Sequence, residues 1–137
     1  MELSDFKDLN YLAILIGAVA YWLVGALWYS PVLFGKRWQE LTGVTAENAA
    51  SPMLTYLGGL VLLFVTCVGL GFLTETSGAS DVKDGLQLGL GVSIAFVTAQ
   101  LVLNAMYEKR PRALVAINAG YAIVGITLAS IIIVLWD

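Results

Sequence analysis

The sequence contains no histidine, a single cysteine and few charged residues. Histidine is the commonest metal ligand and the most frequent general base, so its absence removes the usual haem ligand and any serine–histidine triad. The lone cysteine, Cys67, excludes a disulfide framework within the chain and a paired-cysteine redox motif. We therefore predict no catalytic residue, no metal site and no cofactor, and we favour a non-enzymatic role over an enzyme.

Charged residues make up 12% of the 137 residues, whereas soluble globular domains carry about a quarter. The net charge is −3, and no basic patch is large enough to indicate nucleic acid as a partner. Each of the three prolines lies at a boundary of an apolar run. Pro31 follows the first run, Pro52 begins the second and Pro111 precedes the fourth. Proline is disfavoured inside a helix but tolerated at its first turn. Scarce charge and this placement of proline favour long, uninterrupted apolar helices.

Apolar residues are abundant, at 59% of the chain, and they fall into four long runs. The runs cover about residues 9–29, 52–73, 82–107 and 112–136. At about 1.5 Å per residue, runs of about 20 to 25 residues cross a hydrocarbon core roughly 30 Å thick. Each run is apolar on nearly every face, which argues against a soluble bundle. We predict an all-α polytopic membrane protein, with residues 1–137 forming a single membrane domain of four transmembrane helices in two hairpins.

Lysine and arginine concentrate in the first and third connections between the runs. These connections contain Lys36, Arg37, Lys109, Arg110 and Arg112, whereas the opposite side has only Lys7 and Lys83. Cytoplasmic loops of membrane proteins carry an excess of such residues. The pattern predicts a protein of the plasma membrane, of the bacterial inner-membrane type. Its N- and C-termini then lie outside, and its basic loops, 30–51 and 108–112, lie in the cytoplasm.

The third run carries small and then polar residues along one face. Within an arc of about 140°, at about 100° per residue, lie Gly85, Gly89, Ser93, Phe96, Gln100, Asn104 and Glu108. Small residues let a neighbouring helix approach, and amides in hydrocarbon need hydrogen-bond partners. In the fourth run, Asn118 lies at a depth similar to that of Asn104, with Tyr121 beside it. We therefore predict a polar cluster, which forms either an interhelical seam or a cavity open to the cytoplasm, made of Gln100, Asn104, Glu108, Asn118 and Tyr121.

The chain after the first run has the densest local pattern. It reads Trp28-Tyr29-Ser30-Pro31-Val32-Leu33-Phe34-Gly35-Lys36-Arg37-Trp38. Ser30-Pro31 is expected to turn the chain, and Phe34, Trp38 and Leu41 then recur at helical spacing with charged residues between them. This spacing predicts a short amphipathic segment that lies in the membrane interface.

These residues resemble the membrane-protein family known as domain of unknown function 1761. The resemblance continues at Tyr107-Glu108-Lys109-Arg110-Pro111 and at Ile117-Asn118-Ala119-Gly120-Tyr121, and it covers essentially the whole chain. The family-like motif positions are Trp28, Tyr29, Ser30, Pro31, Phe34, Gly35, Lys36, Trp38, Arg110 and Pro111. The resemblance implies a four-span fold. It implies no activity, because no function is established for the family.

Three classes of function stay open. Fourteen glycines and the lack of catalytic chemistry favour a non-enzymatic helical bundle that self-associates or joins a larger membrane complex. The alternative is an oligomeric channel or transporter for a small solute, lined by the polar face of the third helix. An enzyme that acts on a lipid through Tyr29, Ser30 or Glu108 is the least favoured, because neither histidine nor a pair of inward-facing acids is present. The expected partners are the lipid bilayer and either further copies of the chain or a larger membrane complex.

Overall fold

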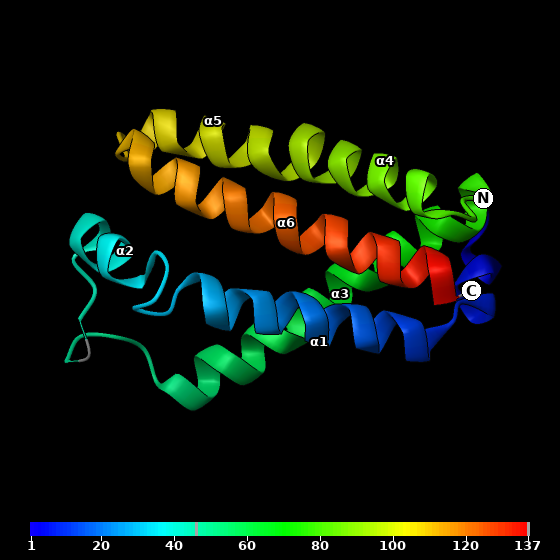
Figure 1. Cartoon of the computed structure of the whole chain (residues 1–137), viewed down its shortest axis with the longest axis horizontal. Coiled ribbons are helices and arrows are strands. Elements are labelled where there is room, and N and C mark those ends of the chain that lie inside the picture. The colour runs from blue at the N-terminus through cyan, green and yellow to red at the C-terminus, as the bar shows by residue number, and fades with distance from the viewer. Residues whose placement is uncertain (46, 137) are drawn as a thin grey trace.

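The structure is a computed structural model that describes residues 1–45 and 47–136. Within these ranges every regular element is a helix, and four helical segments are long and apolar enough to cross a membrane (Figure 1). These segments are α1 (Tyr11–Trp28), α3 (Pro52–Ser77), the continuous segment Val82–Glu108, and α6 (Arg112–Trp136). The predicted all-α, four-span class is confirmed.

The third segment is built from three consecutive helical elements. They are α4 (Val82–Val92), the π-helix η2 (Ser93–Thr98) and α5 (Ala99–Glu108). Two short helices lie outside the apolar segments, the 3₁₀-helix η1 (Leu3–Asp8) and α2 (Gly35–Thr42). The sequence predicted α2 as an amphipathic segment but gave no sign of η1 or η2.

Local side chains define where the helices begin and end. The Asn10 side chain accepts a hydrogen bond from the Ala13 amide at 3.1 Å, and Asp81 accepts one from Asp84 at 2.8 Å, so both satisfy amides that have no partner inside the helix. Helix α3 continues past its predicted end near Leu73. It stops at Gly78, whose φ of 74° is the left-handed conformation that glycine adopts without strain.

The two ends of the bundle differ in what they contain. Both termini lie at one end, and the connections around α2 and between α5 and α6 lie at the other (Figure 1). At the terminal end, the Asn10 side-chain amide donates a hydrogen bond to the Trp136 carbonyl at 3.3 Å. This is the arrangement expected of two antiparallel hairpins.

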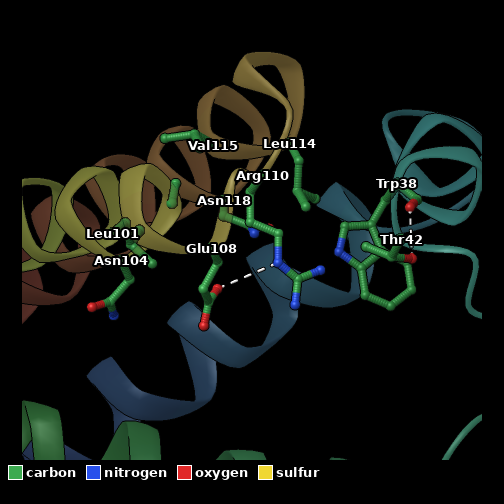
Figure 2. Close-up of a pocket in the computed structure, with 10 residues that line it drawn as sticks. Trp38, Thr42, Leu101, Asn104, Glu108, Arg110, Leu114, Val115 and Asn118 are labelled. Atoms are coloured by element: carbon green, nitrogen blue, oxygen red, sulfur yellow. Dashed lines mark hydrogen bonds and ion pairs between the residues drawn. The ribbon is translucent and has the colours of Figure 1, made fainter.

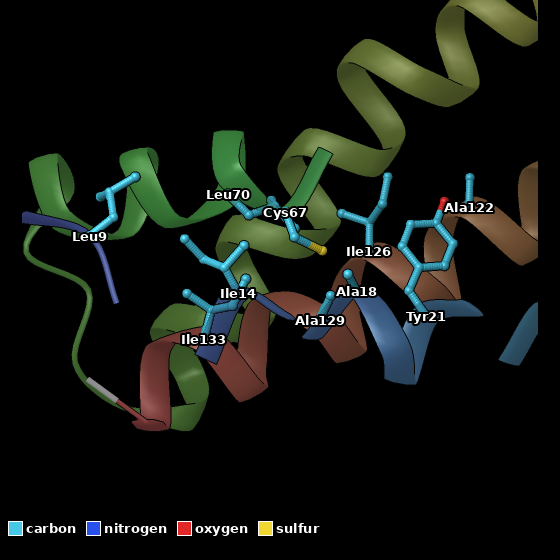
Figure 3. Packing of buried hydrophobic residues seen from close by; sticks show 10 residues of the cluster. All are labelled: Leu9, Ile14, Ala18, Tyr21, Cys67, Leu70, Ala122, Ile126, Ala129 and Ile133. Atoms are coloured by element: carbon cyan, nitrogen blue, oxygen red, sulfur yellow. The ribbon is translucent and has the colours of Figure 1, made fainter. Parts of the chain in front are cut away.

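Helix α6 is the central element. In its most apolar stretch 44% is buried, against 11% in the third segment. It packs with α1 and α3 around a core in which Ala18 and Ala129 are fully buried, so that large residues from neighbouring helices fit between them (Figure 3). The core consists of Leu9, Ile14, Ala18, Tyr21, Cys67, Leu70, Ala122, Ile126, Ala129 and Ile133.

Helix α4 lies against α6 with almost no space between the two backbones. A Cβ atom added at Gly89 would lie 2.5 Å from the Thr127 Cα, and one at Gly85 would lie 2.9 Å from the Ile131 Cα. Backbone atoms do not move aside as a flexible side chain does, so a larger residue at either position forces the helices apart. These two glycines perform the close packing that small residues provide in membrane bundles.

Helix α3 crosses α1, and its N-terminal half diverges from the rest of the bundle (Figure 1). Met53, Leu54 and Leu62 on this half are 71%, 71% and 68% exposed. A Cβ atom at Gly58 or Gly59 would meet nothing within 4 Å. The glycines of α3 therefore do not all serve packing inside the chain, because only Gly71 contacts a core side chain closely, that of Ile14.

Candidate functional site

The π-helix η2 divides the stripe that the sequence placed on one face of the third segment. Before it, Gly85, Gly89 and Ser93 are buried against α6. After it, Gln100 and Asn104 are exposed, and Leu101 and Ala105 become the half-buried residues of α5. Hydrogen bonds of the i→i+5 type rotate the chain less per residue than the 100° or so of an α-helix, so the following face is turned away from its expected direction.

A cleft of about 300 Å³ lies between α2, α5 and α6 at the end opposite the termini (Figure 2). Helix α5 contributes amide, carboxylate and apolar side chains, α6 contributes mostly apolar ones, and α2 contributes an indole and a hydroxyl. Its lining residues are Trp38, Thr42, Leu101, Asn104, Ala105, Glu108, Arg110, Leu114, Val115 and Asn118.

The mouth of the cleft carries one acidic and one basic side chain. Arg110 Nε donates to a Glu108 carboxylate oxygen at 3.3 Å, and the two side chains are 50% and 58% exposed (Figure 2). Between them, Lys109 ends α5 with a φ of 54°, which reverses the chain direction toward α6. An exposed pair of this kind is screened by water and contributes little to stability, so both charges remain available to a ligand.

The motif that follows α1 attaches this end of α1 to α6. The Tyr29 hydroxyl donates to Asn118 Oδ1 at 2.7 Å, and Trp28 Nε1 donates to the Ile117 carbonyl at 2.9 Å. The Tyr29 ring also lies edge-on to Trp38 and to Tyr121, with centroid distances of 5.9 and 5.3 Å. These contacts position α2, and therefore Trp38, beside the cleft.

The tight turn between α1 and α2 depends on two further motif residues. Ser30 Oγ donates to the Leu27 carbonyl at 2.6 Å, and the amide of Gly35 donates to the Ser30 carbonyl at 2.9 Å. A Cβ atom at Gly35 would collide with the Tyr29 carbonyl, so this position requires glycine. Phe34 packs on Trp28 at a centroid distance of 4.9 Å, whereas Pro31 and Lys36 are exposed.

The predicted polar residues fall into two groups. Asn104, Glu108 and Asn118 line the cleft, and Gln100 joins them indirectly because its side chain donates to Asn104 Oδ1 at 3.0 Å. Tyr121 instead lies among aromatic rings, 5.0 Å from Tyr21 and packed against Gly25. Of the family-like motif, Trp38 and Arg110 line the cleft as well, and Pro111 is exposed in the turn that leads into α6.

The sequence did not single out Thr42, Leu101, Leu114 or Val115 as site residues. Thr42 follows Trp38 by one helical turn, and its hydroxyl donates to the Trp38 carbonyl at 2.8 Å. Leu101 likewise lies three residues before Asn104. Residues three or four apart lie on one face of a helix, so these spacings indicate that Thr42 lies beside Trp38 and Leu101 beside Asn104. The apolar lining itself has no sequence signature, because it resembles every other lipid-facing surface of the chain.

The chemistry of this cleft suits binding rather than nucleophilic catalysis. Its side chains offer hydrogen-bond donors and acceptors, one charge of each sign and an aromatic face, but no activated nucleophile paired with a base. Among the residues that the structure describes, no cluster of acidic or cysteine side chains could hold a metal ion.

Apolar helices of bilayer length, arranged in hairpins and joined at one end by basic connections, define the chain as a small polytopic α-helical membrane protein. The chain belongs to the family described as "Protein of unknown function (DUF1761)", which matches residues 12–134. The resemblance carried by the two separated motifs is thereby confirmed. No curated protein and no solved structure matches the chain.

Proposed function

We propose that this protein is a non-enzymatic membrane protein that self-associates through the outer face of its third helical segment. The observation that carries the proposal is the Gln100–Asn104 pair on α5. Both side chains are exposed, and Gln100 Nε2 donates to Asn104 Oδ1 at 3.0 Å. This bond uses one N–H of the Gln100 amide and one acceptor position of the Asn104 amide. The remaining donor and acceptor groups belong to exposed side chains.

The depth of Gln100 in the membrane determines how much the exposure of its amide matters. The segment Val82–Glu108 has 27 residues and is about 40 Å long, roughly 10 Å longer than a hydrocarbon core. A centred segment leaves about 5 Å outside at each end, so Gln100, about 12 Å from the Glu108 end, lies inside the hydrocarbon. An unpaired amide there costs several kcal/mol, which a hydrogen bond to a second copy recovers in part.

The exposed surface of the same segment also carries small residues that a second helix can approach closely. Gly91, Ala95 and Ala99 recur every four residues and are all exposed, and a Cβ atom at Gly91 would meet nothing within 4 Å. Small residues at this spacing allow helix backbones to come near each other, and polar side chains then bond across the contact. This stripe of small residues and the Gln100–Asn104 pair lie on adjoining parts of this exposed surface, about 100° apart around the helix. The exposed surface formed by Gly91, Ala95, Ala99, Gln100 and Asn104 is called the outer face.

Association is tested by counting the copies of the protein in lipid nanodiscs or mild detergent by native mass spectrometry. We expect the double variant Gln100→Leu with Asn104→Leu to weaken self-association about tenfold, since such interhelical bonds contribute about 1 to 2 kcal/mol. Gln87→Leu is the matched control, because Gln87 is an exposed amide near the other end of the same segment. A wild-type chain that stays monomeric at every concentration contradicts the proposal.

The proposed orientation places both termini outside the plasma membrane and loops 30–51 and 108–112 in the cytoplasm. It is supported by the basic residues of those loops, which outnumber Lys7 and Lys83 at the terminal end of the bundle. Labelling of introduced cysteines by a membrane-impermeant reagent tests it. Labelling of Ser4→Cys from outside supports this orientation. Labelling of Lys36→Cys from outside, without labelling of Ser4→Cys, shows the opposite orientation.

An oligomeric channel or transporter for a small solute is the second candidate, because Asn104, Glu108 and Asn118 share one cleft. In that case the cleft and the outer face of several copies line a path. Solute flux into proteoliposomes that is unchanged by Asn104→Leu and by Glu108→Gln excludes this path.

A further inference from the structure

The cleft between α2, α5 and α6 has charges of both signs at its mouth and apolar side chains deeper inside. Glu108 and Arg110 are exposed at the mouth, whereas Leu114 is buried and Leu101 and Val115 are half-buried. A ligand that matches this arrangement has a polar group with both charges and an apolar part that continues into hydrocarbon.

The cleft lies where the headgroups of a bilayer are expected. It lies at the Glu108 end of the third segment and next to α2, whose Lys36 and Arg37 are exposed. Trp38, a residue type that is common at the membrane–water interface, forms one wall. A ligand reaches this site laterally from the lipid leaflet.

We propose that this cleft binds the headgroup of a phospholipid that carries both a phosphate and a primary ammonium, as phosphatidylethanolamine does. The Arg110 guanidinium holds the phosphate through charge-assisted hydrogen bonds, and the Glu108 carboxylate accepts hydrogen bonds from the ammonium. The Thr42 side chain supplies a further polar contact within the lining. This site belongs to a single copy of the chain and does not depend on self-association.

The volume of the cleft sets the size of the bound group. A volume of about 300 Å³ places the cleft at the lower end of ligand pockets. That space suits a headgroup and leaves the acyl chains in the surrounding bilayer.

The pairing of the two charges selects among headgroups. Arg110 and Glu108 contact each other at 3.3 Å while about half exposed, and such pairs contribute little, so a ligand separates them readily. A zwitterionic headgroup gives each charge an opposite partner. A purely anionic headgroup places its charge beside the Glu108 carboxylate, and a choline headgroup has no N–H to donate to it.

The test is native mass spectrometry of the full chain in mild detergent, titrated separately with phosphatidylethanolamine, phosphatidylglycerol, phosphatidylcholine and free phosphoethanolamine. We expect phosphatidylethanolamine to bind most tightly. Arg110→Gln weakens the binding of both phosphatidylethanolamine and phosphatidylglycerol about tenfold, since it removes a charged hydrogen-bond donor. Glu108→Gln weakens phosphatidylethanolamine alone and leaves phosphatidylglycerol unchanged or tighter.

Lys109→Gln is the matched control, because it removes the same charge from an adjacent residue that does not line the cleft. We expect it to change the binding of phosphatidylethanolamine less than threefold. Equal binding of every lipid to the wild type and to each variant overturns the proposal, as does tighter binding of phosphatidylglycerol that Glu108→Gln does not alter. Free phosphoethanolamine that binds as tightly as the lipid overturns the assignment to a lipid.

Discussion

The two halves of the third helical segment meet α6 in different ways. In α4, Gly85 and Gly89 bring the two backbones into contact. In α5, beyond the π-helix η2, Gln100 and Asn104 are exposed and a cleft separates part of the helix from α2 and α6. One apolar segment therefore packs closely inside the bundle with its first half and exposes polar side chains with its second. Glycines at four-residue spacing mark the first half, and amides at the same spacing mark the second.

Helix α1 packs against α6 along its length, from Gly17 beside Ile133 to Gly25 beside Tyr121, and the other contacts of α6 differ between its two ends. Near the terminal end, α6 faces α4 through Thr127 and Ile131. Near the loop end, it is held by the motif after α1, through the bonds from Tyr29 to Asn118 and from Trp28 to the Ile117 carbonyl. The loop end of α6 is thus fixed by α1, which leaves the neighbouring part of α5 free to form one wall of the cleft.

Replacing a glycine of the packed half is expected to have the largest effect. In Gly89→Leu the new side chain meets the Thr127 backbone, so we expect the free energy of unfolding to fall by about 3 kcal/mol. The measurement is unfolding in mixed micelles as the fraction of denaturing detergent rises, under conditions in which the protein is monomeric.

Gly91→Leu is the matched control for this variant, since it lies two residues away in the same helix with nothing within 4 Å of its Cβ position. Its unfolding free energy should not fall, and the loss of a mid-helix glycine should raise it by up to about 1 kcal/mol. Equal destabilisation by the two variants contradicts the distinction between the packed and the outward surfaces.

A smaller effect is expected where α1 holds the loop end of α6. Tyr29→Phe removes the hydroxyl that donates to Asn118 at 2.7 Å and should lower the unfolding free energy by about 1 kcal/mol. Tyr107→Phe is the control, because Tyr107 is 83% exposed and should respond negligibly. If Tyr29→Phe is as stable as the wild type, α6 is not held at this end by that bond.

The smallest effect is expected on the surface of α2. Arg37 donates to Glu40 at 3.3 Å, with the side chains 57% and 67% exposed, so Arg37→Gln should change the unfolding free energy by less than about 0.5 kcal/mol. The same unfolding experiment measures it. If Arg37→Gln lowers the unfolding free energy by more than about 1 kcal/mol, the loss is as large as that of a buried hydrogen bond. In that case α2 is positioned by its charged face rather than by Tyr29 and Trp38.

Hydropathy predicted the helices, because a run of this length that is apolar on every face crosses a bilayer as a helix that satisfies its own backbone groups. The same uniformity explains why it did not predict packing. Nothing in the apolar sequence of α3 distinguishes Gly71, which packs on Ile14, from Gly58, which faces open space. Lipid and protein are equally apolar surroundings for such a helix.

The site was predicted in part and in separate pieces. Asn104, Glu108, Asn118, Arg110 and Trp38 were each singled out from the sequence, and the structure brings them to one cleft. Their convergence depends on where α2 folds back and on the rotation that η2 introduces. Neither follows from residue spacing, because a regular helical projection assumes the same rotation at every residue.

The central claim is that the outer face of the third segment contacts a second copy of the chain. Oxidative cross-linking of Ala99→Cys in native membranes tests it directly, with the buried Cys67 replaced by alanine and Val124→Cys as the control. Val124 is 43% exposed on α6 and lies outside the proposed contact. A disulfide-linked dimer with Ala99→Cys and little with Val124→Cys is the predicted result. Equal cross-linking at the two positions, or none at Ala99→Cys, contradicts the claim.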